Sequence, residues 1–266
     1  MRLYLSSCII ICILSYVFLN NPHIEHYTEQ SDIRILHLVL YSSSIEYDKM
    51  YLLTRDYYKK FNNIITIYYT FSLKYNIITL VDDILYIPGN DTYLPGILDK
   101  TIKAFLYCDL HYKYDYIVRS NISTIVNFNL LSNKLNKTSI DYGGGQYLLL
   151  RTIDVLNGIT NNKYFGTYYV GGTAIIFSNK MIKLLLLNKD KLDYSVVDDV
   201  AIGVLIKEQF PDIAISYIQP MFYNTNPINM SDIASNQYLY YRNKTNNRMN
   251  DVNHMKQIID ILNNLS

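Results

Sequence analysis

The sequence predicts an α/β fold, and three observations support this prediction. Apolar runs of strand length, rich in β-branched and aromatic residues, recur at residues 33–41, 64–71 and 116–118. Between the first two runs, residues 45–61 repeat their apolar side chains at helical spacing. The third run ends in a cluster of polar residues, and open α/β sheets bind ligands at the carboxyl ends of their strands.

Length and composition fit one such domain with a short extension. The 266 residues are 50% hydrophobic and 18% charged, so the chain can bury a sizeable core and is not globally disordered. The formal net charge of +1 gives no electrostatic argument for a nucleic-acid partner.

The N-terminal segment predicts a membrane anchor. Residues 3–19 are apolar apart from three serines, which is at the short end of the ~17–25 residues needed to span a bilayer. Arg2 favours a cytoplasmic N-terminus. The residues around Asn20 form no small-residue cleavage site, so an uncleaved signal-anchor is favoured over a cleaved signal peptide, which would make the protein secreted.

We therefore expect a single-pass type II membrane protein. Its transmembrane helix would be residues 1–21, its stem residues 22–31, and its folded domain residues 32–266, in an ER- or Golgi-like lumen or outside the cell. Cys108 is the only cysteine beyond the apolar segment, so the folded domain can form no internal disulfide. Six residues match the glycosylation acceptor pattern: Asn90, Asn121, Asn136, Asn229, Asn243 and Asn264.

The other elements follow in order along the chain. We expect a polar turn at residues 42–44, a short strand within 77–87, a helix over 92–108 and, capped by Ser178, a helix over 179–187. An amphipathic helix is expected over 251–262. Residues 129–137 fit either a helix end or a loop. The glycines 143–145 fit either a mobile loop over a substrate or a plain flexible turn.

The central stretch is residues 114–128. After the apolar strand come the polar residues Arg119, Ser120, Asn121, Ser123 and Thr124. Two interpretations stay open from the pattern alone: a ligand site at the strand end, or a strand that leads into a capped helix.

This stretch resembles the central strand of the β-1,3-galactosyltransferase and Fringe-like glycosyltransferases, which have a GT-A fold with a Rossmann-like mixed sheet. In that family a run of acids after the strand binds a metal and the sugar-nucleotide diphosphate. Asn121 falls on the first acid and Ser123 on the last, so both carboxylates are missing. The chain is more similar to a divergent group of these enzymes, common in large DNA viruses, which carries an Arg-(Ser/Thr)-Asn-(Leu/Ile)-Ser-(Ser/Thr) segment here.

Further blocks extend the resemblance. Residues 90–101 resemble the family's Asp-Ser-Tyr…Lys-Thr block, which would bring Lys100 to the diphosphate; otherwise Lys100 is a solvated helix lysine. Residues 169–178 resemble its glycine-rich strand, where Gly171 and Gly172 would lie against the sugar or the acceptor. Residues 241–255 resemble its C-terminal Tyr-Arg-x-Lys…Arg…Asp…Met pattern, in which Arg242 and Lys244 would neutralise the diphosphate.

Residues 197–203 resemble the family's (Glu/Asp)-Asp-Val-x-x-Gly motif, which starts a helix. The resemblance makes one of two acids the general base for the acceptor hydroxyl, with Asp199 preferred over Asp198. The simpler interpretation is capping, with Asp198 as the N-cap residue.

The resemblance implies an inverting hexosyltransferase. It would move a galactose or N-acetylhexosamine type of sugar from a nucleoside diphosphate sugar, with UDP as the expected carrier, to a glycan or glycoprotein hydroxyl. Mn²⁺ or Mg²⁺ serves related enzymes, with Asn121 and Ser123 at the metal position, but neutral oxygens are weak ligands for such hard cations. We expect Arg119, Lys100 and the C-terminal basic residues to replace part of the metal's role, while a metal bound by the donor phosphates remains an alternative. The competing hypothesis is an inactive glycan-binding or structural membrane protein that retains the fold.

Overall fold

The computed structural model describes residues 33–224, 230–235 and 238–265. Ile33–Ser266 belong to one compact unit. The expected anchor at residues 1–21 and the stem at 22–31 lie outside the described residues. Within the described ranges, no helix is both long and apolar enough to cross a membrane.

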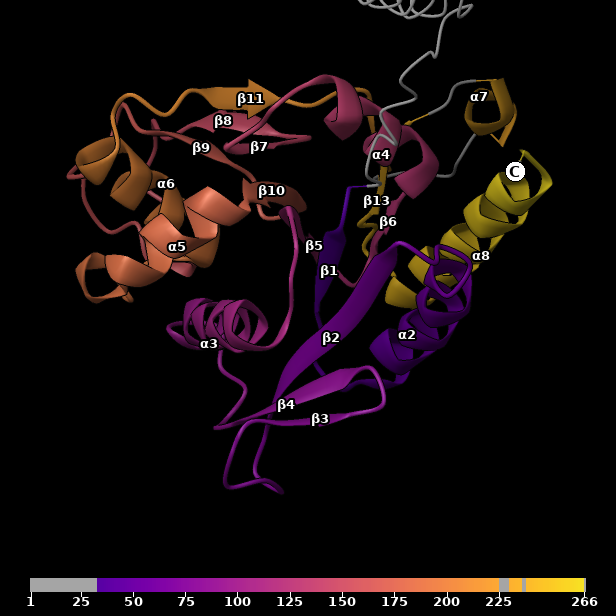
Figure 1. Cartoon of the computed structure of the whole chain (residues 1–266), viewed down its shortest axis with the longest axis horizontal. Coiled ribbons are helices and arrows are strands. Elements are labelled where there is room, and N and C mark those ends of the chain that lie inside the picture. Colours follow the sequence, from indigo (N-terminus) through magenta and orange to yellow (C-terminus); the bar gives the residue numbers. More distant parts are fainter. Residues whose placement is uncertain (1–32, 225–229, 236–237, 266) are drawn as a thin grey trace, which may run out of the picture. The chain divides into compact units, whose positions relative to one another are not determined.

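A mixed sheet forms the centre of this unit (Figure 1). For the described residues it has eight strands, in the order β11-β7-β10-β5-β1-β2-β4-β3. The four central strands β5, β1, β2 and β4 are parallel to one another. Strand β10 runs antiparallel to both β5 and β7, and β3 runs antiparallel to β4. In chain order the strands are β1 (Ile35–Leu40), β2 (Ile64–Ser72), β3 (Thr79–Val81), β4 (Ile84–Pro88), β5 (Tyr116–Asn121), β7 (Tyr142–Gly144), β10 (Ala174–Ser178) and β11 (Ile215–Tyr217).

Two smaller sheets flank the large one. Strands β12 (Met221–Asn224), β13 (Tyr240–Asn243) and β6 (Thr124–Val126) form the first, in which β13 pairs antiparallel with β6. Strands β8 (Tyr147–Leu149) and β9 (Tyr168–Val170) pair as the base of an arm. The tip of this arm is a 3₁₀ turn at Val155–Asn157.

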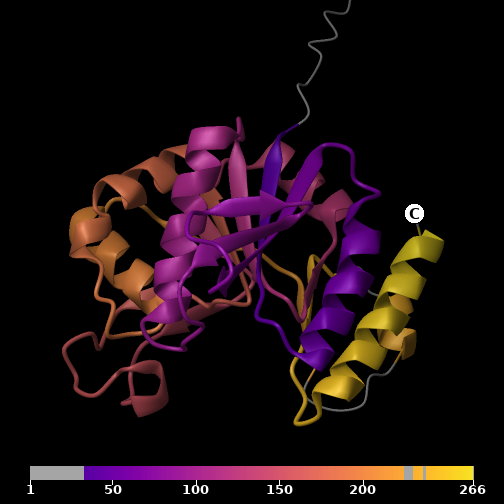
Figure 2. The same cartoon turned by 90° about the horizontal axis from the view of Figure 1, so that it is seen from below.

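Helices cover both faces of the large sheet (Figures 1 and 2). Side chains alternate along β1, so Leu36 and Leu38 pack in one core cluster and Ile35 and Val39 in the other. The first cluster takes in α3 (Gly96–His111), α5 (Asn179–Leu187) and α6 (Asp198–Gln209). The second takes in α2 (Ile45–Tyr58), α4 (Phe128–Lys137), the short α7 (Met230–Ser235) and α8 (Arg248–Leu265). The predicted α/β fold, a mixed sheet flanked by helices, is confirmed.

Local sequence signals explain several helix starts. Ser44 accepts a hydrogen bond from the Tyr47 amide at 3.2 Å and caps α2, and Ser178 accepts one from the Met181 amide at 3.0 Å and caps α5 as predicted. Asn127 caps α4, so residues 129–137 are a helix and not a loop. The N-cap of α6 is Val197, so Asp198 is the first helical residue, and the alternative interpretation with Asp198 as the N-cap residue is wrong.

Two of the three glycines at 143–145 are in a strand, where we expected a mobile loop or a flexible turn, and Gly145 lies in the bend that follows. Gly143 and Gly144 lie in the buried strand β7, between β10 and β11. A Cβ atom at Gly144 would lie 2.2 Å from the carbonyl oxygen of Ala174. Glycine at these positions allows neighbouring strands to pack closely. A run of glycines in a sequence does not by itself indicate this role.

Candidate active site

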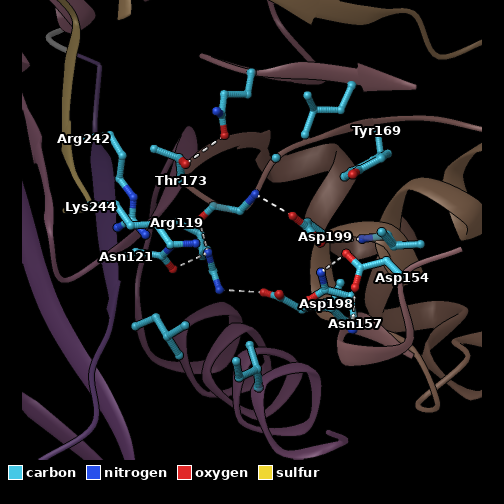
Figure 3. A pocket seen from close by; sticks show the side chains of 18 of the residues that line it. Arg119, Asn121, Asp154, Asn157, Tyr169, Thr173, Asp198, Asp199, Arg242 and Lys244 are labelled. Carbon is cyan, nitrogen blue, oxygen red and sulfur yellow. Dashed lines mark hydrogen bonds and ion pairs between the residues drawn. The ribbon is translucent and has the colours of Figure 1, made fainter. Parts of the chain in front are cut away.

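A pocket of about 560 Å³ opens where β1 and β5 end. Leu40 and Asn121, the last residues of these two strands, both line it. The first turn of α6, the arm between β8 and β9, and the segment from β13 into α8 supply most of the other lining residues. Figure 3 shows Asp154, Asp198 and Asp199 on one side of the pocket, Arg242 and Lys244 on the other, and Arg119 between them.

Arg119 on β5 forms a buried ion pair with Asp198. Its Nη2 atom lies 2.6 Å from Oδ2 of Asp198, and both side chains are almost fully buried. Arg119 also donates to the Tyr69 hydroxyl at 3.3 Å and to the carbonyl of Gly172. Asp198 therefore neutralises Arg119, and this pair fixes the start of α6 against the central strand.

Asp199, the next residue, has different contacts. Its Oδ2 accepts a hydrogen bond from the amide of Gly172 at 2.7 Å, and its Oδ1 accepts one from the amide of Val200 at 2.8 Å. The side chain is half-buried and lines the pocket. Burial, together with the negative charge of Asp198, raises the pKa of Asp199 to about 6. A carboxylate with this pKa is suited to accept a proton near neutral pH.

Gly172 permits this arrangement because it has no side chain. A Cβ atom at residue 172 would lie 3.1 Å from Nη1 of Arg119 and 3.3 Å from Oδ2 of Asp199. Its neighbour Gly171 also lines the pocket and donates its amide hydrogen to the Gln146 carbonyl at 3.0 Å. Both predicted glycines thus lie beside the acidic side of the pocket.

Asn121 and Ser123 line the pocket, and each accepts a hydrogen bond from an arginine. Nη1 of Arg119 donates to Oδ1 of Asn121 at 3.0 Å, and Nη1 of Arg242 donates to Oγ of Ser123. Among the described residues, no three His, Cys, Asp or Glu side chains are grouped so that they could hold a metal ion. A divalent cation at Asn121 and Ser123 would face two guanidinium groups, so these residues do not fit the metal ion that the resemblance implied.

The basic side of the pocket is built by β13 and the start of α8. Arg242 is 6% exposed, and Lys244 and Arg248 follow it along the pocket wall. Burial, followed by the positive charge of Arg248, lowers the pKa of Arg242 to about 10. Burial and the charges of Arg242 and Arg248 also lower the pKa of Lys244.

Two predicted site residues are not part of the lining that the described residues give this pocket. Lys100 is buried in α3, and its Nζ donates to Asp91 at 2.7 Å and to the Tyr41 carbonyl at 3.2 Å. Ser120 points into the core, with its hydroxyl 2.8 Å from Nε2 of the buried His37. The structure thus brings together Arg119, Asn121, Ser123, Gly171, Gly172, Asp198, Asp199, Arg242 and Lys244, but not Lys100 or Ser120.

Sequence reasoning missed the tip of the arm. Asp154 and Asn157 line the pocket near Asp199, and the Tyr93 hydroxyl donates to Oδ1 of Asn157. Burial, with the negative charges of Asp199 and Asp154, raises the pKa of Tyr169 to about 12. The one available signal was Asn157-Gly158, a common turn pair in hairpins, and Gly158 has a φ of 79°.

No protein-family model and no curated protein sequence matches the chain. Solved structures similar to it include a glycosyltransferase involved in glycosylation of the major capsid of PBCV-1, at 9% identity and a TM-score of 0.46 over 84% of this chain and 98% of that one. The galactosyltransferase LgtC in complex with donor and acceptor sugar analogues aligns at 10% identity and a TM-score of 0.44, over 86% and 95%. The inositol-1-phosphate CTP transferase from T. maritima aligns at 9% identity and a TM-score of 0.45, over 86% and 97%. All three TM-scores are below 0.5.

Proposed function

We propose that the protein is a glycosyltransferase of the GT-A type that uses a nucleoside diphosphate sugar. The observation that carries this proposal is that one pocket holds a carboxylate with a raised pKa and, across from it, a cluster of cations. A nucleotide sugar presents the matching pair of chemical groups: an anionic diphosphate and, next to it, the anomeric carbon of the sugar.

In this proposal Asp199 is the general base. It takes the proton from an acceptor hydroxyl as the hydroxyl oxygen bonds to the anomeric carbon and the bond from that carbon to the diphosphate oxygen breaks. The nucleoside diphosphate leaves, and the single displacement inverts the anomeric configuration. Asp198 acts indirectly, because its ion pair with Arg119 holds the helix that carries Asp199.

The leaving diphosphate gains negative charge in the transition state, and fixed cations stabilise such charge. The basic side of the pocket can supply this stabilisation. Arg119 contributes little net positive charge, because Asp198 is paired with it. Asn121 and Ser123 do not fit a divalent ion, so in this proposal the cations of the protein stabilise the leaving diphosphate.

The donor sugar of the galactose or N-acetylhexosamine type, the glycan or glycoprotein acceptor and the type II membrane location are proposed with this function. The competing hypothesis, a non-catalytic glycan-binding or structural protein, rests on the missing acids at Asn121 and Ser123. It offers no reason for a half-buried carboxylate with a raised pKa in the pocket.

The test is the release of nucleoside diphosphate by the full chain from a panel of UDP- and GDP-sugars. We expect turnover of at least one donor and a loss of about 10²–10⁴-fold in Asp199→Asn, the range typical of a general base. Lys256→Gln, an exposed position on α8 paired with Asp260, is the matched control and should keep the wild-type rate. Absence of turnover and of binding for every nucleotide sugar would move the assignment to the non-catalytic alternative.

A further inference from the structure

The cations on the basic side of the pocket outnumber their acidic partners. Arg248 pairs with Asp251 at 2.8 Å, and this carboxylate is fully buried and also accepts from the amide and hydroxyl of Thr245, both at 2.8 Å. Arg242 and Lys244 form no ion pair within the described part of the chain. The cluster therefore carries a surplus of positive charge.

Arg242 is the buried member of this cluster. It is 6% exposed, its Nη1 donates to Ser123, and its Nε has no hydrogen-bond partner among the described residues. Thr124 lies opposite Arg242 in the β13–β6 register, and its buried hydroxyl oxygen also has no partner in the described ranges. A buried guanidinium without a carboxylate is costly, and a bound anion offsets that cost.

The position of this cluster at the pocket wall indicates which anion it suits. Lys244 and Arg248 line the same cavity as Arg242, so three donors from β13, the loop after it and the start of α8 line one space. Arginine binds phosphate oxygens through two parallel hydrogen bonds, and lysine adds a compact charge. Three neighbouring cations therefore match the two linked phosphates of a diphosphate better than a single carboxylate.

We propose that Arg242, Lys244 and Arg248 bind the donor diphosphate without a divalent cation; this inference rests on the proposed function and deepens it. The neutral residues at the end of β5 agree with it, because Asn121 and Ser123 each accept from an arginine where a metal would need carboxylates. Arg119 and Lys100, also expected to replace the metal, are neutralised by Asp198 and Asp91. Asp251 neutralises only one of the three cations of the C-terminal cluster, Arg248, so the cluster stays positive through Arg242 and Lys244 and the role falls to it.

The first experiment measures binding of inorganic pyrophosphate and of UDP to the full chain by calorimetry, in EDTA and then with Mn²⁺. We expect both to bind in EDTA, with a Kd that Mn²⁺ changes by less than about threefold. Lys244→Gln and Arg248→Gln should each weaken binding by about tenfold or more, as expected for the loss of a charged hydrogen bond. Lys256→Gln on the same helix as Arg248 should leave both Kd values unchanged.

Pyrophosphate binding that requires Mn²⁺, or that both glutamine variants leave intact, would overturn the inference. A different result would contradict the proposed function and leave the anion site in place. If pyrophosphate binds in EDTA but no nucleotide sugar binds or reacts, the anion site stands and the transferase assignment falls.

A second variant tests the buried arginine without relying on activity. Thermal unfolding of the wild type in EDTA should shift to higher temperature when pyrophosphate is added, because a ligand that binds the folded state stabilises it. Arg242→Gln should fold, unfold at the same or a higher temperature than the wild type without pyrophosphate, and lose the pyrophosphate-induced shift. A variant that keeps the full shift would contradict a role for Arg242 in anion binding.

Discussion

Asp198 and Asp199 are neighbours in sequence with opposite environments. Asp198 lies in a buried ion pair with Arg119, whereas Asp199 accepts two backbone hydrogen bonds and lines the pocket. From these contacts we infer that Asp198 stabilises the fold and that Asp199 takes part in the reaction.

Substitution of the two acids should separate these roles. Asp198→Asn should lower the free energy of unfolding by about 3 kcal/mol, because it leaves the Arg119 charge buried without a partner. Asp199→Asn should lower that free energy by only about 1 kcal/mol, because the asparagine amide nitrogen cannot accept one of the two backbone hydrogen bonds, while the substitution also removes repulsion between two adjacent carboxylates. Urea denaturation of both variants checks this, and equal destabilisation would contradict the assignment.

The pKa of Asp199 predicts a pH dependence. A general base works in its ionised form, so kcat/KM should rise about tenfold per pH unit below the pKa of about 6 and level off above it. The measurement is the rate of nucleoside diphosphate release from about pH 5 to about pH 8, with stability followed in parallel. A flat profile across that range, in a protein that stays folded, would show that another group accepts the proton.

Sequence alone could indicate the two acids but not divide their roles. The Val197–Gly203 stretch marked a helix start, yet the partner of Asp198 is 79 positions earlier in the chain. Likewise, Ser123 meets Arg242 only because β13 pairs with β6. Lys100 was misplaced for the same reason, since its Nζ donates to the Tyr41 carbonyl, 59 positions earlier in the chain, only because α3 packs there.

At the scale of elements, close packing of α6 on β9 sets the acidic side of the pocket. Gly203 lies on the α6 surface that contacts β9, and a Cβ atom there would lie 2.4 Å from Cβ of Tyr169. Tyr169 in turn lines the pocket beside Asp199. The spacing of helix and strand therefore fixes where Asp199 lies.

Gly203→Ala should disturb this contact. We expect a loss of about 1–3 kcal/mol in the free energy of unfolding, because a methyl group is forced into packed space. Turnover should fall as well, because α6 carries Asp199. Chemical denaturation measures this change. If the position were unobstructed, alanine would raise the free energy of unfolding by up to about 1 kcal/mol, because alanine favours the helix more than glycine does. A stabilised variant would contradict this packing account.

Element prediction worked where a segment's own pattern decided its structure. The strand at 64–71, the helix at 179–187 and its serine cap came from periodicity and capping, and the structure confirms them. Element prediction failed where packing against another segment determined the structure. Residues 143–145 lack strand formers, but Gly143 and Gly144 lie in the sheet because β10 and β11 leave no room for side chains.

At the scale of the whole molecule, charge is nearly balanced overall and strongly divided within the pocket. The formal net charge of +1 gave no hint of a phosphate site. Asp154, Asp198 and Asp199 lie on one side, and Arg242 and Lys244 lie on the other (Figure 3). Folding creates this separation from segments far apart in sequence.

The most direct test of the account is a crystal structure of the full chain with a UDP-sugar, grown in EDTA. The account predicts diphosphate oxygens within hydrogen-bond distance of Arg242, Lys244 and Arg248, and the anomeric carbon on the side of the pocket that holds Asp199. A diphosphate bound outside this pocket, or a sugar turned away from Asp199, would contradict the central claim.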